Sequence, residues 1–238
     1  MTKSDQIDKR HMAQKPAKIL AIETSTSACS VALRCDGELK TFTEVGTNVH
    51  SQEVLPQIEK LLRQVNWKVQ ELDAVAVGQG PGSFTGLRIG VGVAQGISYG
   101  ARCPMIGVSS LAALAIAADV HHGLVSAAID ARMGELYFAQ YNVHAGELER
   151  IGEEVVCAPQ ELKCADVGIL IGNAWQQYWH SFKPEMIQNI ECPSPSFPNA
   201  REVLMLAEGD YTAQKFTDAK SFAPVYVRNN VAKKTADR

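Results

Sequence analysis

Two segments of the chain combine residue types that could bind an anion. In the first, Glu23, Thr24, Ser25 and Thr26 follow an apolar run, so a carboxylate and three hydroxyl groups stand at the end of an expected strand. There they could hold phosphate oxygens or a metal ion. The alternative is structural, because Ser and Thr side chains also close turns and cap helices by bonding to nearby backbone.

The second segment is the glycine-rich stretch 78–90, between an expected strand and an expected helix. Its backbone N–H groups and the helix N-terminus could receive an anion near Gly80, Gly82, Ser83 and Thr85. It is not a Walker A loop, because no Gly-Lys-Ser/Thr ends it, and it lacks the Gly-x-Gly-x-x-Gly of dinucleotide-binding folds. The glycines could equally serve only a sharp turn and close helix–sheet packing, and the spacing leaves both interpretations open.

Glycines also recur at four-residue spacing through the following helix. This spacing places each ladder along one side of the helix, where another backbone could approach closely. Each interior glycine costs a helix about 1 kcal/mol relative to alanine, so we expect a compensating contact. One ladder could face the chain's own sheet, and the other a neighbouring helix or a partner subunit. The ladders are Gly82, Gly86 and Gly90, and then Gly92, Gly96 and Gly100.

Other residues that could act in catalysis or bind metal are scattered. The six histidines form no His-x-x-x-His or His-Glu-x-x-His pattern, and Gly-x-Ser-x-Gly is absent, so the sequence predicts neither a histidine metal site nor a catalytic triad. Asp130 and Arg132 flank an expected hairpin turn, where they could form an internal ion pair or contact a partner. Trp175, Tyr178 and Trp179 lack interleaved basic residues, so we expect them to pack within the fold.

The composition is that of an ordinary globular protein. The 238 residues are 46% hydrophobic and 21% charged, and the formal net charge of −3 excludes attraction to nucleic acid or anionic membrane through an overall basic excess. No Cys-x-x-Cys pair occurs among the six cysteines and no signal sequence is recognised, which predicts a cytoplasmic chain with free thiols. No apolar run approaches the ~20 residues that span a bilayer.

Hydrophobic periodicity in the first half predicts a mixed sheet covered by helices. The first three strands should form an antiparallel meander with a turn at Asp36-Gly37. The first helix is expected to be capped by Ser51 and kinked or restarted at Pro56. The expected elements are strands 19–22, 29–34 and 39–45, a helix over 51–65, a strand over 72–77, a helix through Tyr99 and a strand over 104–108.

The second half repeats this outline, which predicts two similar lobes. The expected elements are strands 124–129, 135–143 and 150–156, a short helix over 159–164, a strand over 167–171, an extended exposed loop over 192–198 and a helix from the cap Asn199 to about 208. The expected divisions are a polar disordered leader over 1–17, a first lobe over 18–108, a second lobe over 109–211 and a tail over 212–238 that packs back on the first lobe.

Several motifs together resemble the bacterial TsaB (YeaZ) family, over residues 18 to about 230. The resemblance implies an α/β fold of the actin-like, Hsp70-like (ASKHA, RNase H-like) class, with two similar lobes of mixed sheet covered by helices. The motifs are Ala21-Ile22-Glu23-Thr24-Ser25, Leu72-Asp73-Ala74-Val75-Ala76-Val77, Gly80-Pro81-Gly82-Ser83-Phe84-Thr85-Gly86-Leu87-Arg88, Ala128-Ile129-Asp130-Ala131-Arg132 and Pro224-Val225-Tyr226-Val227-Arg228.

The resemblance implies a role in making threonylcarbamoyladenosine beside the anticodon of tRNAs that read codons starting with A. In that family TsaB is the noncatalytic paralogue of TsaD, which transfers the threonylcarbamoyl group. TsaE, an ATPase, joins the pair, and TsaC makes the threonylcarbamoyl adenylate. The implied partners are TsaD and TsaE, or a second copy when the chain is alone, with tRNA contacted through the complex. No cofactor is expected to be tightly bound, although ATP or ADP could bind in the assembled complex.

Two differences from TsaD imply that this chain is noncatalytic. TsaD resembles the chain around Glu23 and Gly80 but carries a metal-binding His-x-x-x-His. Aligned through the segment 104–108, those histidines fall on Ser110 and Leu114, and leucine cannot ligate a metal. The Asp-Glu pair of TsaD is replaced by Ser27-Ala28. No residue is therefore assigned to catalysis or to metal binding.

The resemblance also assigns a partner surface to the two helices of the first lobe, which form a bundle with those of TsaD or of a second copy. The residues expected on that surface are Leu55, Ile58, Leu62, Phe84, Leu87 and Val91, with Gly86 and Gly90 permitting close approach. The residues that could bind nucleotide or phosphate are Glu23, Thr24, Ser25, Gly80, Gly82, Ser83 and Thr85. Two other functions stay open: a stand-alone nucleotide-binding ASKHA enzyme and a metallopeptidase-like protein.

Overall fold

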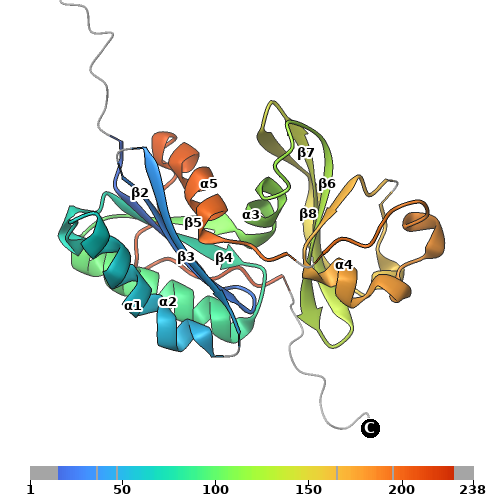
Figure 1. Ribbon diagram of the computed structural model, residues 1–238, viewed down its shortest axis with the longest axis horizontal. Coiled ribbons are helices and arrows are strands. Elements are labelled where there is room, and N and C mark those ends of the chain that lie inside the picture. Colours follow the sequence, from blue (N-terminus) through green and yellow to red (C-terminus); the bar gives the residue numbers. More distant parts are fainter. Residues whose placement is uncertain (1–15, 36, 47, 165, 195, 228–238) are drawn as a thin grey trace, which may run out of the picture.

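Two β-sheets stand side by side with helix α3 between them (Figure 1). The computed structural model describes residues 16–35, 37–46, 48–164, 166–194 and 196–227. Most of the expected leader, the turn residue Asp36 and the end of the tail from Arg228 lie outside the described residues. The two mixed sheets with their helices confirm the predicted α/β fold of two lobes.

The first sheet begins as the predicted antiparallel meander. Parallel pairing of β4 to β1 and of β5 to β4 then extends it, so that the strand order is β3-β2-β1-β4-β5. β4 runs three residues beyond the predicted end, and the glycine-rich segment therefore begins as a strand. The strands are β1 (Ile19–Glu23), β2 (Ala28–Cys35), β3 (Glu38–Val45), β4 (Ala74–Gly80) and β5 (Met105–Ser109).

Helices α1 (Val49–Gln64) and α2 (Phe84–Ala101) cover one face of this sheet. α1 begins at Val49, two residues earlier than predicted, and its N-cap is Asn48, whose φ of 61° is left-handed. The expected cap, Ser51, lies within the helix and donates a hydrogen bond to the Asn48 carbonyl oxygen. The helix continues through Pro56, so the expected restart is wrong. Pro56 is exposed, and water can satisfy the carbonyl group that loses its partner there.

Helix α5 (Ala200–Thr212) covers the opposite face of the same sheet, which corrects its assignment to the second lobe. Its Val203, Leu204 and Ala207 are buried against this face of the sheet, where alanines from β1, β2 and β4 allow the helix to approach closely. The predicted cap is confirmed, because Asn199 Oδ1 accepts a hydrogen bond from Arg201 N at 3.3 Å.

Helix α3 (Ser110–Ile116) is missing from the elements expected from the sequence, although it joins the two lobes. Ser109 caps it by accepting a hydrogen bond from Ala112 N at 3.2 Å. Ala113 packs against the first sheet, whereas Leu111 and Leu114 pack against the second. A serine cap before an apolar run was the available signal.

The second sheet has the order β8-β7-β6-β9, and its last strand is parallel to β6. α3 packs on one face, and α4 (Asn173–Gln177) covers the other, where Trp175 is fully buried as expected. The predicted helix over 159–164 is only a 3-10 turn at Pro159–Glu161. The loop over 192–198, which was expected to be exposed, has a buried residue at its end, Pro198. The strands are β6 (His122–Arg132), β7 (Glu135–His144), β8 (Glu147–Cys157) and β9 (Ile169–Ile171). Further 3-10 turns span Trp179–Ser181 and Pro184–Met186 in this lobe, and Val69–Glu71 before β4 in the first lobe.

Three further expectations concern the thiols, the membrane and the tail. The six cysteines are free thiols, as expected. Within the described part of the chain, no helix is long and apolar enough to cross a bilayer. The tail returns to the first lobe, where Val225 N donates a hydrogen bond to Gln79 O at 2.8 Å.

Truncating Leu204 tests whether α5 stabilises the first sheet. Leu204→Ala should lower the free energy of unfolding by about 2–5 kcal/mol, because it leaves a cavity under a side chain that is 1% exposed. Urea unfolding measures the change. Met205→Ala is the matched control on the same helix, since Met205 is 42% exposed and its truncation should change the stability little. Equal effects of the two substitutions would contradict the packing of α5.

Candidate functional site

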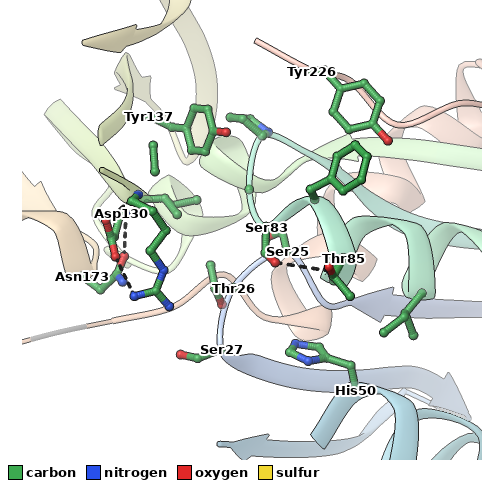
Figure 2. Close-up of a pocket in the computed structure, with 18 of the residues that line it drawn as sticks. Ser25, Thr26, Ser27, His50, Ser83, Thr85, Asp130, Tyr137, Asn173 and Tyr226 are labelled. Carbon is green, nitrogen blue, oxygen red and sulfur yellow. Dashed lines mark hydrogen bonds and ion pairs between the residues drawn. The ribbon is translucent and has the colours of Figure 1, made fainter. Parts of the chain in front are cut away.

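A cleft of about 780 Å³ opens between the two lobes (Figure 2). The first lobe contributes the loop 25–27 after β1 and the turn 81–83 with the first residues of α2, and the second lobe contributes the hairpin tip 130–132 and Asn173. Tyr226 of the tail lies beside the start of α2. The two segments singled out from the sequence therefore meet in one cavity, which the sequence analysis did not predict.

Glu23 lies beneath the cleft rather than on its wall. Its carboxylate is fully buried; one oxygen accepts a hydrogen bond from Ser25 N at 2.6 Å and the other from Ser110 Oγ at 3.0 Å. Burial raises the pKa of Glu23 above its ordinary value of 4.5, although these hydrogen bonds oppose the shift. A Cβ at Gly78 would collide with this carboxylate, so Gly78 is needed for packing. The expectation that Glu23 binds a ligand directly is therefore corrected to a structural role.

Thr24 is also structural, because it is fully buried and its hydroxyl donates a hydrogen bond to Gly86 O at 2.8 Å. Ser25, by contrast, lines the cleft. Its backbone oxygen accepts a hydrogen bond from Ser83 N at 2.6 Å. Its buried Oγ makes no hydrogen bond of good geometry among the described residues, and its polar neighbour is the Glu23 carboxylate. An unsatisfied buried hydroxyl costs about 1–3 kcal/mol, so a ligand that bonds to this atom would recover that free energy.

The start of α2 supplies further donors. Ser83 caps the helix by accepting a hydrogen bond from Gly86 N at 3.3 Å, and the side chain of Thr85 is exposed on the first turn. An anion would be stabilised here by the unpaired N–H groups and by the helix dipole. Gly82 lines the cavity, whereas Gly80 lies outside its lining and is packed beside the carbonyl oxygen of Val225. Of the residues expected to bind phosphate, Ser25, Gly82, Ser83 and Thr85 thus line the cleft.

The glycine ladders have roles that the sequence left open. Side chains at Gly82, Gly86 or Gly90 would collide with the loop formed by Thr24 and Ser25, so this ladder serves contact inside the chain. Its assignment to a partner surface at Gly86 and Gly90 is wrong. For Gly92, Gly96 and Gly100, no atom of the described residues lies within 4 Å of an added Cβ, and this ladder faces outward.

Most of the apolar residues expected on the partner surface also face inward. Leu55 is 57% exposed and Phe84 is 47% exposed. The others are buried in the core between the helices and the sheet, because they occupy the sheet-facing sides of α1 and α2, and they cannot reach a partner. They are Ile58, Leu62, Leu87 and Val91.

The second lobe contributes an anchored hairpin to the cleft. Asp130 Oδ1 accepts hydrogen bonds from Tyr178 OH at 2.6 Å and from Arg132 N at 2.8 Å, and its backbone N–H donates to Asn173 Oδ1 at 3.1 Å. Burial and the hydrogen bond to Asp130 raise the pKa of Tyr178 to about 12. Arg132 Nη1 lies 3.3 Å from Asp130 Oδ2, which confirms the internal ion pair, but the arginine side chain is 82% exposed. An exposed guanidinium thus faces the cavity that holds the α2 N-terminus.

This arrangement can hold an anionic group. The donors are the Ser25, Ser83 and Thr85 hydroxyls, the α2 N-terminus and the Arg132 guanidinium. The imidazole in the lining, that of His50, has its Nε2 at 3.2 Å from Ala28 O rather than at a hydroxyl nucleophile. Across the described residues, no three His, Cys, Asp or Glu side chains come together as metal ligands.

Several site residues were not found from the sequence. The roles of Ser110 and Asn173 were missed because each depends on a residue far away in the sequence. Ser110 bonds to the Glu23 carboxylate, and Asn173 bonds to the backbone N–H of residue 130. Tyr226 was named only as part of the tail, yet its ring lies 5.6 Å from that of Phe84, and Arg88 Nε donates a hydrogen bond to its hydroxyl at 3.3 Å.

Comparison with known proteins identifies relatives along most of the chain. Residues 44–236 match the family model described as TsaD, tRNA N6-adenosine threonylcarbamoyltransferase. The chain is similar to the tRNA threonylcarbamoyladenosine biosynthesis protein TsaB of Escherichia coli K12, with 38% identity over 90% of this chain and 96% of the relative. The TsaB of Haemophilus influenzae Rd is 37% identical over 90% of this chain and 94% of the relative. Among solved structures, YeaZ from Pseudomonas aeruginosa matches with a TM-score of 0.80 and 35% identity, covering 88% of this chain and 99% of that one.

Two glycine substitutions on α2 should have opposite effects on stability. Gly86→Ala should lower the free energy of unfolding by about 1–3 kcal/mol, because its Cβ collides with the Thr24 carbonyl oxygen and the backbones must separate. Gly96→Ala is the matched control and should raise it by up to about 1 kcal/mol, since the position is open and alanine favours a helix. Urea unfolding of both variants checks the assignment, and stabilisation by both would refute the contact with Thr24.

Titration of the buried Glu23 carboxyl should appear in the pH dependence of stability. Because its pKa is raised in the folded state, the unfolded chain releases this proton first, so stability falls as the pH rises from 4.5 towards the folded-state pKa. Urea unfolding of the wild type and of Glu23→Gln from pH 4.5 to 8 measures this effect. The wild-type free energy of unfolding, less that of the variant, should decrease as the pH rises over this interval. An increase would mean that the hydrogen bonds from Ser25 and Ser110 outweigh burial.

Proposed function

Because the chain belongs to the TsaB (YeaZ) family of tRNA threonylcarbamoyladenosine biosynthesis proteins, we propose that it is a noncatalytic scaffold or activating subunit that pairs with TsaD. With TsaE and ATP, the pair would serve threonylcarbamoyl transfer to the adenosine beside the anticodon of tRNAs that read codons starting with A. TsaC supplies the adenylate in this scheme, and the assembly acts in the cytoplasm.

The observation that carries the noncatalytic role is the chemistry of α3. Ser110 and Leu114 occupy the two positions at which the resemblance to TsaD places metal-binding histidines. Ser110 Oγ donates its hydrogen bond to Glu23, and Leu114 is fully buried in the core of the second lobe. A leucine side chain has no atom that can bind a metal, so the pair cannot act as metal ligands.

The outer faces of α1 and α2 support the pairing. Figure 1 shows the two helices side by side on the face of the first sheet away from α5. Leu55 and Tyr99 are 57% and 71% exposed there, and Gly92, Gly96 and Gly100 leave the α2 backbone uncovered. Exposed apolar side chains beside a bare helix backbone are suited to packing against helices of another subunit, either TsaD or a second copy when the chain is alone.

The cleft favours a second role within the same assembly, the binding of ATP or ADP. The unpartnered Ser25 hydroxyl, the α2 N-terminus and the exposed Arg132 suit a phosphate group. The same features are what a stand-alone nucleotide-binding protein would need. Calorimetry with ATP on the isolated chain separates the two, because tight binding without TsaD would favour the stand-alone function.

Gly96→Arg tests the partner surface. The variant should fold, because no atom of the part of the chain that the structure describes lies within 4 Å of the added Cβ, but its side chain should prevent a partner helix from approaching α2. We expect loss of the heterodimer with TsaD in size-exclusion chromatography with light scattering, together with loss of stimulation in a modification assay on unmodified tRNA with TsaC, TsaD, TsaE and ATP.

Gly209→Arg is the matched control for this experiment, because Gly209 is an equally open helical glycine on α5. It should pair and stimulate like the wild type. Normal pairing of Gly96→Arg would show that the surface is wrongly assigned. If the wild type itself neither pairs with TsaD nor stimulates modification, the proposed function is wrong.

A further inference from the structure

Two exposed histidines stand side by side on neighbouring strands at the end of the second sheet. His122 begins β6 and His144 ends β7, and the two residues are directly paired in the antiparallel register. Their ring centroids are 5.1 Å apart, with an angle of 63° between the planes. Directly paired residues project from the same face of a sheet, so both imidazoles share one side.

The ring separation matches that of two imidazoles on one metal ion. Each centroid would lie about 3.2 Å from the metal, given a metal–nitrogen bond of about 2.0–2.1 Å. A tetrahedral angle at the metal then separates the centroids by about 5 Å. Rotation of the exposed side chains can bring one nitrogen of each ring to a common point without moving the strands.

The backbone holds both positions in place. Ala145 and Gly146, with φ of 53° and 82°, form the two-residue turn between β7 and β8 immediately after His144. Gly146 N donates a hydrogen bond to His121 O at 3.3 Å, which ties this turn to the residue before His122. A pair fixed on two strands is preorganised, so a metal would not have to order the chain when it binds.

The surrounding charge also favours a cation. Glu147 is paired with His144 across the turn, and Glu149 is paired with Asn142 on the same strands. Both carboxylates are exposed beside the pair. No third ligand from the described residues completes the site, so water would fill the remaining coordination positions.

We propose that His122 and His144 form a two-imidazole site for a borderline divalent metal ion such as Zn²⁺, Ni²⁺ or Cu²⁺. Imidazole is a ligand that suits these ions. The site is separate from the cleft, since Arg132 lies ten residues along β6, about 30 Å away. The ion bridges β6 and β7, and because the ligands meet only in the folded sheet, it binds the folded chain in preference to the unfolded one.

Metal titration of the full-length, tag-free chain tests the site, with Zn²⁺ and Ni²⁺ as probes in a buffer that does not chelate them. Calorimetry should give one site, and both ions should raise the Tm. His122→Gln and His144→Gln should each weaken binding at least tenfold, and the double variant should bind no more weakly than either single one, because both rings are needed. Matching Tm values without metal show that the variants fold.

His180→Gln and His121→Gln are matched controls, because both histidines are exposed in the same lobe, and His11→Gln serves the same purpose for the N-terminal segment. All three should bind like the wild type. Paramagnetic broadening by Ni²⁺ of two imidazole signals in the wild type, removed by the His122 and His144 substitutions, would support the site independently. Wild-type affinity in His122→Gln and His144→Gln, or loss of binding in a control, would overturn it.

Discussion

The backbone of residues 24–25 lies directly against the start of α2, and the geometry of the cleft depends on this contact. The Thr24 hydroxyl donates a hydrogen bond to Gly86 O, and Ser83 N donates one to Ser25 O, so one side-chain bond and one backbone bond join the two segments directly. The two interior glycines, Gly86 and Gly90, each cost the helix about 1 kcal/mol. In return the Ser25 hydroxyl and the first turn of α2 are held on the same wall of the cleft.

The buried Glu23 carboxylate extends this contact to the joint between the lobes. It bonds to Ser25 N on the loop and to Ser110 Oγ at the start of α3, which packs against both sheets. A carboxylate is costly to bury unless its oxygens are hydrogen-bonded, and both are bonded here. The loop that faces the cleft and the helix that sets the two lobes are therefore fixed by one side chain.

Long, regular elements could be predicted from the sequence, and short elements buried on two sides could not. The strands of both sheets, α2 and the cap of α5 followed from periodicity and turn residues. α3 was missed because its seven residues pack against two sheets and show no polar face. The partner surface was misread for a similar reason, since an apolar stripe indicates a buried side without saying what buries it. Ile58 and Leu62 face the sheet, whereas Leu55 on the same helix faces outward.

The two glycine ladders also show that sequence spacing does not reveal what covers a given side of a helix. Together they define what α2 does. From Gly90 to Gly92 the helix turns by about 200°, so identical spacing exposes bare backbone on opposite sides. The inner ladder is explained by contact with Thr24. At Gly92, Gly96 and Gly100, by contrast, no described residue makes a close contact that would offset the helical cost of glycine. A helix packed against the outer side would offset that cost. α2 then carries the N-terminal turn that faces the cleft and the surface that faces a partner, so a ligand and a partner subunit would contact the same rigid helix.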